Sequence, residues 1–334
     1  MNREEIDKLA TGIAAAEDCV PQVIETHISW VILSDVYAYK IKKPIRYSFL
    51  DFSTPGKRQG DCEREVVLNR RLTEDIYLDV VPVRRERGCY FIGEMKGEVV
   101  DHAVKMKKMD PGRRMDLLLR MDKVSYWDIG RLAERIAGFH HRAVIIPEKD
   151  PMDIPLKFAD LSSEREFLSR HLAIASYIEW SVHLSMVFME RNRQLVDQRR
   201  GEGMIRDCHG DLHTRNVFLL EDPQPFDCIE FNDDMRQIDV LNEVAFLCMD
   251  LDACGKEEFS TVLLTRYNEL FPAIRTREEE LLFIYFKSYR ANVRAKVSSY
   301  RTRSASSRED REPALREAGR YLLLMKEYLE KLCI

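Results

Sequence analysis

The 334-residue sequence has no apolar run long enough to cross a membrane, since a spanning helix needs about 20 such residues. Its first residues are charged and lack the apolar core of a secretory signal peptide. The eight cysteines form no Cys-x-x-Cys pair, which disfavours a zinc site and a disulfide framework. We therefore expect a cytoplasmic protein with reduced thiols and no membrane partner.

The sequence also lacks an excess of positive charge. Its formal net charge is −5, from 52 Lys and Arg against 57 Asp and Glu. A general nucleic-acid-binding protein carries a basic patch or stripe, so we expect no nucleic-acid partner. Hydrophobic residues make up 45% of the chain, which is enough for a core. The length suits one two-lobed fold or two domains.

The most informative stretch is the string His-Gly-Asp-Leu-His-Thr-Arg-Asn at residues 209–216. It places Asp211 five residues before Asn216, ahead of two short apolar runs that flank a Pro-containing turn. This pattern predicts a β-hairpin. With the hairpin centred on that turn, Glu230 would lie nearly opposite Val217. One end of the hairpin would then gather the oxygen ligands that Mg²⁺ and phosphate chemistry require.

A surface hairpin with a packing histidine would explain a lone Asp-x₄-Asn. The whole string, however, resembles the catalytic loop of the aminoglycoside phosphotransferase family, relatives of the protein kinases. The resemblance implies Mg²⁺-dependent transfer of the γ-phosphoryl group of ATP to a hydroxyl of a small molecule. Asp211 would accept or orient the hydroxyl proton, Asn216 would bind Mg²⁺, and His209 would support the loop backbone. A zinc pair of His209 and His213 is disfavoured, because the intervening Gly-Asp predicts a loop.

The second metal ligand departs from the pattern of the family. Most of the family has a Mg²⁺-binding Asp within Ile-Asp-Phe or Ile-Asp-Trp, and here residues 229–231 read Ile-Glu-Phe. Glu230 is therefore the expected ligand, and its longer side chain leaves a weakened or inactive site open. Asp227 is the poorer candidate, because in a continued strand it would lie about 10 Å away on the opposite face. Asp233 and Asp234 are fallback ligands.

A strand pattern over residues 36–43 places Lys40 and Lys42 on one face. Tyr-Ala-Tyr-Lys, which ends at Lys40, resembles the third strand of kinases, whose Lys holds the α- and β-phosphates. Either lysine could take that role, and the Ala-x-Lys spacing favours Lys40. Taken alone, two solvated strand lysines would be the simpler explanation. The resemblance implies that Glu65, on a predicted helix over residues 60–72, pairs with the strand lysine.

The resemblance implies an α+β, protein-kinase-like fold with two lobes. A small β-rich lobe would span residues 1–109 and bind the nucleotide, and a helical lobe would span residues 110–334. Met106 would lie beside the adenine pocket. Asp239 and Glu243 match two acids that brace the catalytic loop in the family, although as an acidic pair four residues apart they also suit an ordinary helix N-terminus.

The predicted turn at residues 29–35 contains no glycine, so one phosphate-binding device of kinases is missing. A pseudokinase or nucleotide-binding regulator therefore remains an alternative, as does AMP transfer on the same fold. Phe-Leu-Asp-Phe-Ser at residues 49–53, after Lys-Ile-Lys-Lys-Pro, resembles an uncharacterised bacterial subgroup that is sometimes fused to a P-loop ATPase domain. No Gly-x₄-Gly-Lys-Ser/Thr string occurs here, so we expect the kinase-like part alone.

Near the end of the chain, residues 287–303 hold six basic residues and no acid. Arg290 and Arg294 share a helix face. The simpler interpretation is a solvated basic face. The alternative is a face that lines the substrate cleft and favours an anionic acceptor.

Overall fold

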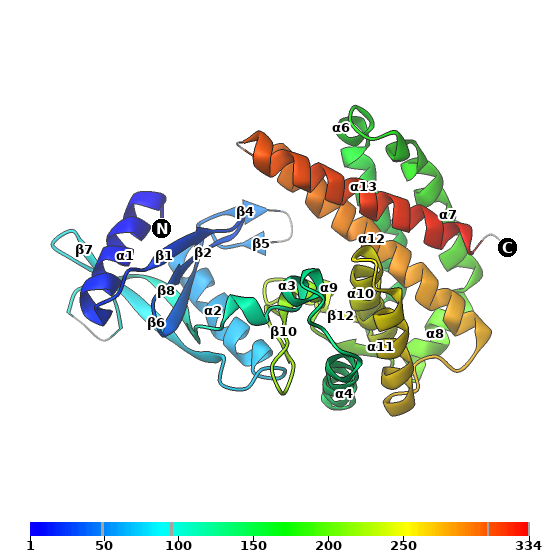
Figure 1. Ribbon diagram of the computed structural model, residues 1–334, viewed down its shortest axis with the longest axis horizontal. Helices are drawn as coiled ribbons and strands as arrows, with labels where there is room; N and C mark the ends of the chain where they lie inside the picture. Colours follow the sequence, from blue (N-terminus) through cyan, green and yellow to red (C-terminus); the bar gives the residue numbers. More distant parts are fainter. Residues whose placement is uncertain (48–49, 94–95, 306, 333–334) are drawn as a thin grey trace. The chain divides into compact units, whose positions relative to one another are not determined.

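The computed structural model describes residues 1–47, 50–93, 96–305 and 307–332 (Figure 1). Phe49 of the Phe-Leu-Asp-Phe-Ser motif lies outside these residues. The chain divides into two compact units. Unit 1 comprises Met1–Leu118 and Asn216–Met235, and unit 2 comprises Leu119–Arg215 and Arg236–Ile334. The segment that begins at Asn216 therefore folds with the N-terminal part of the chain.

Unit 1 is built on a six-stranded sheet with the order β1-β2-β3-β8-β6-β7, and all neighbouring strands are antiparallel. A separate short ribbon pairs β4 with β5. The strands of unit 1 that precede the hairpin are β1 (Gln22–Glu25), β2 (Ser29–Leu33), β3 (Tyr37–Lys42), β4 (Arg46–Tyr47), β5 (Leu50–Asp51), β6 (Tyr77–Glu86), β7 (Cys89–Ile92) and β8 (Glu98–Lys107).

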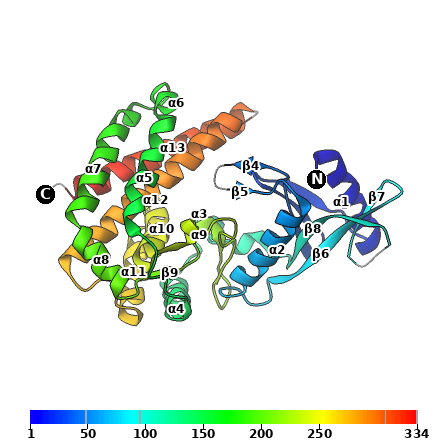
Figure 2. The same ribbon diagram turned by 180° about the vertical axis from the view of Figure 1, so that it is seen from behind.

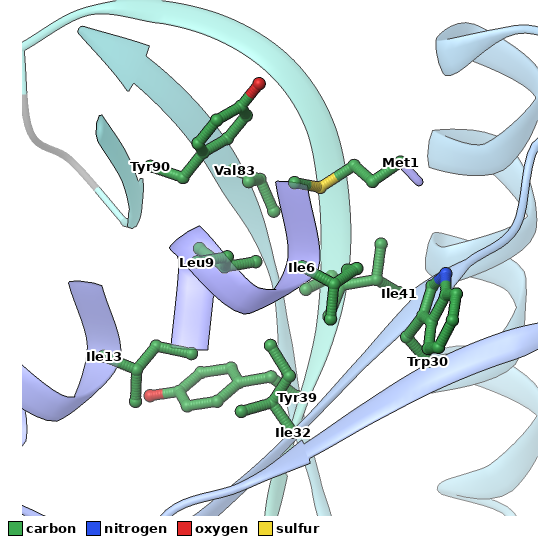
Figure 3. Packing of buried hydrophobic residues seen from close by; sticks show 11 residues of the cluster. Met1, Ile6, Leu9, Ile13, Trp30, Ile32, Tyr39, Ile41, Val83 and Tyr90 are labelled. Carbon is green, nitrogen blue, oxygen red and sulfur yellow. The ribbon is translucent and has the colours of Figure 1, made fainter. Parts of the chain in front are cut away.

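Helix α1 (Arg3–Glu17) supplies the core on one face of this sheet. Its apolar residues at helical spacing pack against alternate residues of the strands, as Figure 3 shows for Ile6, Leu9, Ile32, Tyr39 and Ile41. Asn2 begins the helix with a capping box. Its side chain accepts from the backbone N–H of Glu5, and the Glu5 side chain accepts from the backbone N–H of Asn2.

Side chains of β3 alternate between the two faces of the sheet. Tyr39 and Ile41 lie in the α1 core, so Lys40 and Lys42 face the other side, where helix α2 (Pro55–Asn69) carries Glu65. The sequence predicted this helix only from residue 60. It begins earlier because Thr54 caps it and proline suits the first helical position.

The predicted hairpin is present in unit 1, but its register is wrong. Strand β10 (Val217–Phe218) pairs with β11 (Gln224–Pro225), and Val217 lies opposite Pro225. Glu230 is therefore not opposite Val217. Asp227 takes a left-handed backbone conformation with φ of 64°, which ends the extended chain soon after β11.

Unit 2 is mainly helical, and α12 and α13 run side by side in both views (Figures 1 and 2). No helix in the described part of the chain is both long and apolar enough to span a membrane. The elements of unit 2 are α4 (Tyr126–Arg142), α5 (Ile154–Ala159), α6 (Arg165–Ser169), α7 (Ile178–Arg191), α8 (Arg193–Gly201), β9 (Ile205–Asp207), β12 (Gln237–Asp239), α10 (Val240–Ala253), α11 (Glu257–Leu270), α12 (Arg277–Ser304) and α13 (Arg308–Glu330).

Short elements complete the chain, namely α3 (Met115–Arg120) and α9 (Asp233–Arg236) near the unit boundaries and the 3-10 turns at Pro111–Arg113, Pro151–Asp153, Asp160–Glu164, Ala173–Tyr177 and Thr214–Asn216. Residues 163–197 do not form one continuous helix. Leu172 is extended, and the Asn192 amide donates to the Phe188 carbonyl where α7 ends. Such side-chain bonds compete with helix continuation.

Gly12 provides a test of how α1 packs. A Cβ there would lie 3.3 Å from the backbone carbonyl carbon of Tyr90 in β7 and closer still to its oxygen. We expect Gly12→Ala to destabilise unit 1 by about 1–3 kcal/mol, because overpacking outweighs the higher helix propensity of alanine. Gly130→Ala in α4 is the matched control, because nothing lies within 4 Å of its added Cβ; it should stabilise by up to about 1 kcal/mol.

Urea unfolding of the two variants measures both effects. Equal midpoints for Gly12→Ala and Gly130→Ala would contradict the described packing of α1 on β7.

Candidate active site

Strand β3 and helix α2 bring two lysines onto one glutamate in unit 1. Lys40 Nζ donates to Glu65 Oε1 at 2.8 Å, and Lys42 Nζ donates to Oε2 at 2.8 Å. The side chains of Lys42 and Glu65 are fully buried, whereas that of Lys40 is 12% exposed. The pairing predicted for Glu65 is thus present, and it involves both candidate lysines. A role of either lysine in phosphate binding stays a prediction.

Two acids that follow β11 complete this cluster. Asp227 Oδ1 accepts from Lys40 Nζ at 2.6 Å, and Glu230 forms an ion pair with Lys42. Asp227 is 44% exposed, whereas Glu230 is 3% exposed. From the sequence, Asp227 was the poorer candidate because a continued strand would carry it away from Glu230. The left-handed conformation of Asp227 interrupts that strand, so the expectation is wrong. The backbone N–H of Asp227 also donates to the Tyr77 hydroxyl at 3.1 Å.

Burial and charge set the ionisation of the cluster. Burial raises the pKa of Glu65, but Lys40 and Lys42 outweigh it and hold that pKa at about 2. Burial likewise raises the pKa of Glu230, and Lys42 only partly offsets this, so the pKa stays above its ordinary value. Burial lowers the pKa of Lys40, but Asp227 and Glu65 hold it well above its ordinary value. Lys40 is therefore a permanent cation with partial access to solvent.

An apolar cluster adjoins these charges on the same side of the sheet. Met106 and Phe226 pack against a buried cluster that includes Val104, which lies opposite Lys40 in the pairing of β3 with β8. Phe218 and Phe226 stack with ring centroids 4.5 Å apart. Such a wall suits a flat heterocycle, since small-molecule sites are mostly apolar with a few polar groups. A place for Met106 beside adenine stays a prediction.

In unit 2, buried acids of α10 hold the backbone of residues 209–215. Glu243 accepts from the N–H groups of His209 and Gly210 at 2.6 and 2.9 Å. Asp250 accepts from the N–H and the hydroxyl of Thr214 at 2.9 and 2.6 Å. Gly210 has φ of 87°, a conformation that glycine adopts without strain. Hydrogen bonds to buried carboxylates, rather than to water, thus hold the backbone N–H groups of the loop.

The basic helix supports this loop and is not a solvated face at its centre. Arg290 and Arg294 are 4% and 7% exposed, so the expected solvated basic face is wrong at these positions. Arg290 Nη1 donates to the Gly210 carbonyl at 3.1 Å, and its Nε donates to Asn242 Oδ1 at 2.7 Å. Arg290 therefore fastens the loop from a second helix, α12.

Asp239 caps α10 and forms a buried ion pair with Arg199, with distances of 2.7 and 2.8 Å. Of the two acids that resemble the family's bracing pair, Glu243 contacts the loop directly. Asp239 does so indirectly. It lies at the end of β12, and β12 pairs with β9, the strand that precedes the loop.

Asp211 is the ionised acid of the loop. Its side chain is 36% exposed, and Oδ2 lies 3.4 Å from His213 Nε2. Burial raises the pKa of Asp211, but His213 and Arg294 outweigh it and hold that pKa well below its ordinary value. A partly exposed carboxylate that stays ionised can orient a hydroxyl or accept its proton.

Sequence reasoning missed several loop supports, above all Asp250 and Arg290. For Asp250 the signal was a charged residue in an otherwise apolar helix, which needs a buried partner. The structure also brings His140, Cys208 and Glu243 together, with ligand atoms within 4.8 Å. Both oxygens of Glu243 already accept loop N–H groups, so we interpret this cluster as packing beneath the loop.

Comparisons with known proteins identify the fold. No protein-family model matches the chain. An uncharacterised protein of Mycobacterium tuberculosis is 27% identical over 315 residues, which cover 92% of this chain and 59% of that protein. The chain thus spans little more than half the length of this relative.

Two solved structures share the fold. A choline kinase from Cryptosporidium parvum has a TM-score of 0.56 and 10% identity, over 93% of this chain and 90% of its own. The GDP complex of aminoglycoside 2'-phosphotransferase-IIIa has a TM-score of 0.55 and 14% identity, over 98% and 99%. The predicted protein-kinase-like fold, with a β-rich N-terminal and a helical C-terminal part, is confirmed.

The ionisation of Glu65 predicts an acid-sensitive stability. Its pKa is depressed from 4.5 to about 2 on folding, so its stabilising effect is complete above pH 4.5 and is lost as the pH falls toward 2. We expect wild type to lose up to about 3 kcal/mol more than Glu65→Gln across this window. Urea unfolding at a series of pH values measures the difference.

Glu63→Gln is the matched control, because Glu63 is an exposed acid of the same helix. It should follow the wild-type curve. If Glu65→Gln and wild type run parallel between pH 7 and 3, the two lysines do not hold Glu65 as described.

Proposed function

We propose that this chain transfers the γ-phosphoryl group of ATP, with Mg²⁺, to a hydroxyl of a small molecule. The observation that carries the proposal is the His-Gly-Asp loop, whose backbone is fixed by buried groups while the ionised carboxylate of Asp211 keeps partial exposure. The solved structures with this fold include kinases of choline and of aminoglycosides, which supports phosphoryl transfer in general.

Lys40 is the proposed phosphate ligand. It is partly exposed, and its contact with the half-exposed Asp227 can be exchanged for a phosphate oxygen. Lys42 is fully buried between Glu65 and Glu230, so releasing it would leave buried carboxylates uncompensated. The apolar cluster that contains Met106 would take the base of the nucleotide.

The residues of unit 1 fit a magnesium ion, because Mg²⁺ takes hard oxygen ligands. Asp227 offers a half-exposed carboxylate, and Asn216 offers an amide oxygen. We propose these two as the residues that hold the metal. Glu230, the ligand expected from the sequence, is the alternative; its carboxylate is buried against Lys42. Bound there, the metal supplies positive charge that neutralises the phosphates.

The chain's own residues would act by position and charge. Lys40 neutralises charge on the phosphates, and Asp211 orients the acceptor hydroxyl. The hydroxyl proton passes to Asp211 as the new P–O bond forms, and the bond to the β-phosphate oxygen breaks to release ADP. Because Arg290 and Arg294 are buried against the loop, they do not support a preference for an anionic acceptor.

Thermal shift with ATP tests the nucleotide and metal sites. With ligand near 100 times its dissociation constant, we expect wild type to gain about 5 °C with Mg²⁺ and little without it. Lys40→Met should lose the gain, and Asp227→Asn should lose its Mg²⁺ dependence. Glu230→Gln and Asp211→Ala should still respond to Mg²⁺-ATP.

Asp222→Asn is the control for Asp227→Asn, because Asp222 lies in the exposed turn of the same hairpin. If Glu230→Gln loses the Mg²⁺ dependence while Asp227→Asn keeps it, Glu230 is the ligand. If wild type gains nothing from ATP at any Mg²⁺ level, the phosphotransferase proposal fails.

The mass of the product separates phosphoryl transfer from its rivals. We expect acceptor candidates incubated with the protein and Mg²⁺-ATP to gain one phosphate, with ADP as the second product. A gain of AMP with release of pyrophosphate would show nucleotidyl transfer. If the protein binds nucleotide but forms no ADP, not even by slow hydrolysis of ATP, it is a pseudokinase. Asp211→Ala should reduce ADP formation roughly 100-fold or more while it still binds nucleotide.

A further inference from the structure

We infer that His213 is a positioning residue, held in one orientation by a hydrogen bond to its Nδ1, whose Nε2–H donates to the carboxylate of Asp211. The tautomer follows from contacts within unit 2 alone. The consequence for turnover rests on the proposed phosphotransferase function, so the two parts are tested separately.

The tautomer is set by a backbone group. The N–H of Arg215 donates to His213 Nδ1 at 3.2 Å. A backbone N–H is only a donor, so Nδ1 must present its lone pair. A neutral imidazole then carries its hydrogen on Nε2.

His209 repeats the arrangement four residues earlier. The N–H of Asp211 donates to His209 Nδ1 at 3.2 Å, so each loop histidine accepts the N–H of the residue two positions later. Asp211 is therefore held at two places. His209 fixes its backbone, and His213 faces its carboxylate. This repeat explains why the string has histidines on both sides of Asp211 without any need for a zinc ion.

The Nε2 side of His213 meets two groups. Asp211 Oδ2 lies 3.4 Å away, and Arg294 Nη1 lies 3.4 Å away. Since Nε2 carries the hydrogen, it can donate to the carboxylate and cannot accept from the guanidinium. The approach of Arg294 is thus electrostatic, and its positive charge favours the ionised carboxylate of Asp211. The bond to Asp211 is long, as hydrogen bonds of active sites without substrate often are.

Packing keeps the ring in this orientation. His213 is 4% exposed, and its ring lies edge-on to Phe246, with centroids 5.5 Å apart and an angle of 64°. Rotating the ring would break the bond from Arg215 and would turn Nε2 away from Asp211. His213 therefore cannot serve as a general base, since Nδ1 is occupied and Nε2 already bears a hydrogen. Its effect on the reaction is to aim Asp211.

Nitrogen NMR of histidine-labelled protein tests the tautomer without any ligand. We expect the signal that disappears in His213→Gln to show a neutral ring with a slowly exchanging Nε2–H at neutral pH. In Asp211→Ala that N–H should remain on Nε2, because Arg215 sets the tautomer, but its proton should shift upfield and exchange faster. An Nδ1–H tautomer, an imidazolium, or a proton unaffected by Asp211→Ala would overturn the inference.

Turnover of Mg²⁺-ATP, with water or an acceptor, tests the positioning role. We expect His213→Leu to lower kcat roughly 10- to 100-fold with KM for ATP unchanged, because a misaimed carboxylate costs about this much. His213→Gln should recover part of the loss, because its amide N–H can reach the place of Nε2–H. His183→Gln is the control, an exposed histidine of α7, and should match wild type.

The two measurements separate the possible failures. If wild type shows no ADP formation, the proposed function fails, and the NMR result still decides the tautomer and its bond to Asp211. If wild type turns over and His213→Leu is equally fast, the positioning role of His213 is overturned whatever its tautomer.

Discussion

The charged cluster of unit 1 depends on the ion pairs that the buried carboxylate of Glu65 forms with Lys40 and Lys42. A buried carboxylate is tolerated only with compensating charge and hydrogen bonds, and here each oxygen has its own lysine. This requirement ties helix α2 to strand β3. It also draws in the segment after β11, because Asp227 and Glu230 complete the coordination of the two lysines.

Sharing one glutamate between two lysines separates two tasks that would otherwise fall on one residue. Lys42 compensates Glu65 and Glu230 permanently, since none of these three groups has appreciable access to solvent. Lys40 can then leave Asp227 for a ligand oxygen without leaving Glu65 unpaired. Unit 2 also separates buried support from an accessible charge, but there the accessible group is an acid. Buried Glu243 and Asp250 accept from loop N–H groups, while Asp211 stays partly exposed.

The sequence predicts those parts of the site that are local strings or alternate along one element. The common face of Lys40 and Lys42 follows from spacing, whereas the His-Gly-Asp loop and the pairing of Glu65 follow from the resemblance to the phosphotransferase family. The register of the hairpin could not be predicted, because the sequence does not show that the second strand ends at Pro225 and that Asp227 beyond it is left-handed. The surroundings of Arg290 could not be predicted either, because a basic helix face looks the same in sequence whether it meets water or a backbone carbonyl.

The membership of residues 216–235 in unit 1 has a consequence for synthesis on the ribosome. The six-stranded sheet is complete in sequence by Lys107, yet Phe218 packs against Val104 and Lys42 pairs with Glu230. Until these late residues emerge, the growing chain holds two lysines and a glutamate with incomplete partners and an uncovered apolar patch. Unit 1 can therefore complete its folding only after the chain has been synthesised past Met235. Until then its early strands remain incompletely folded.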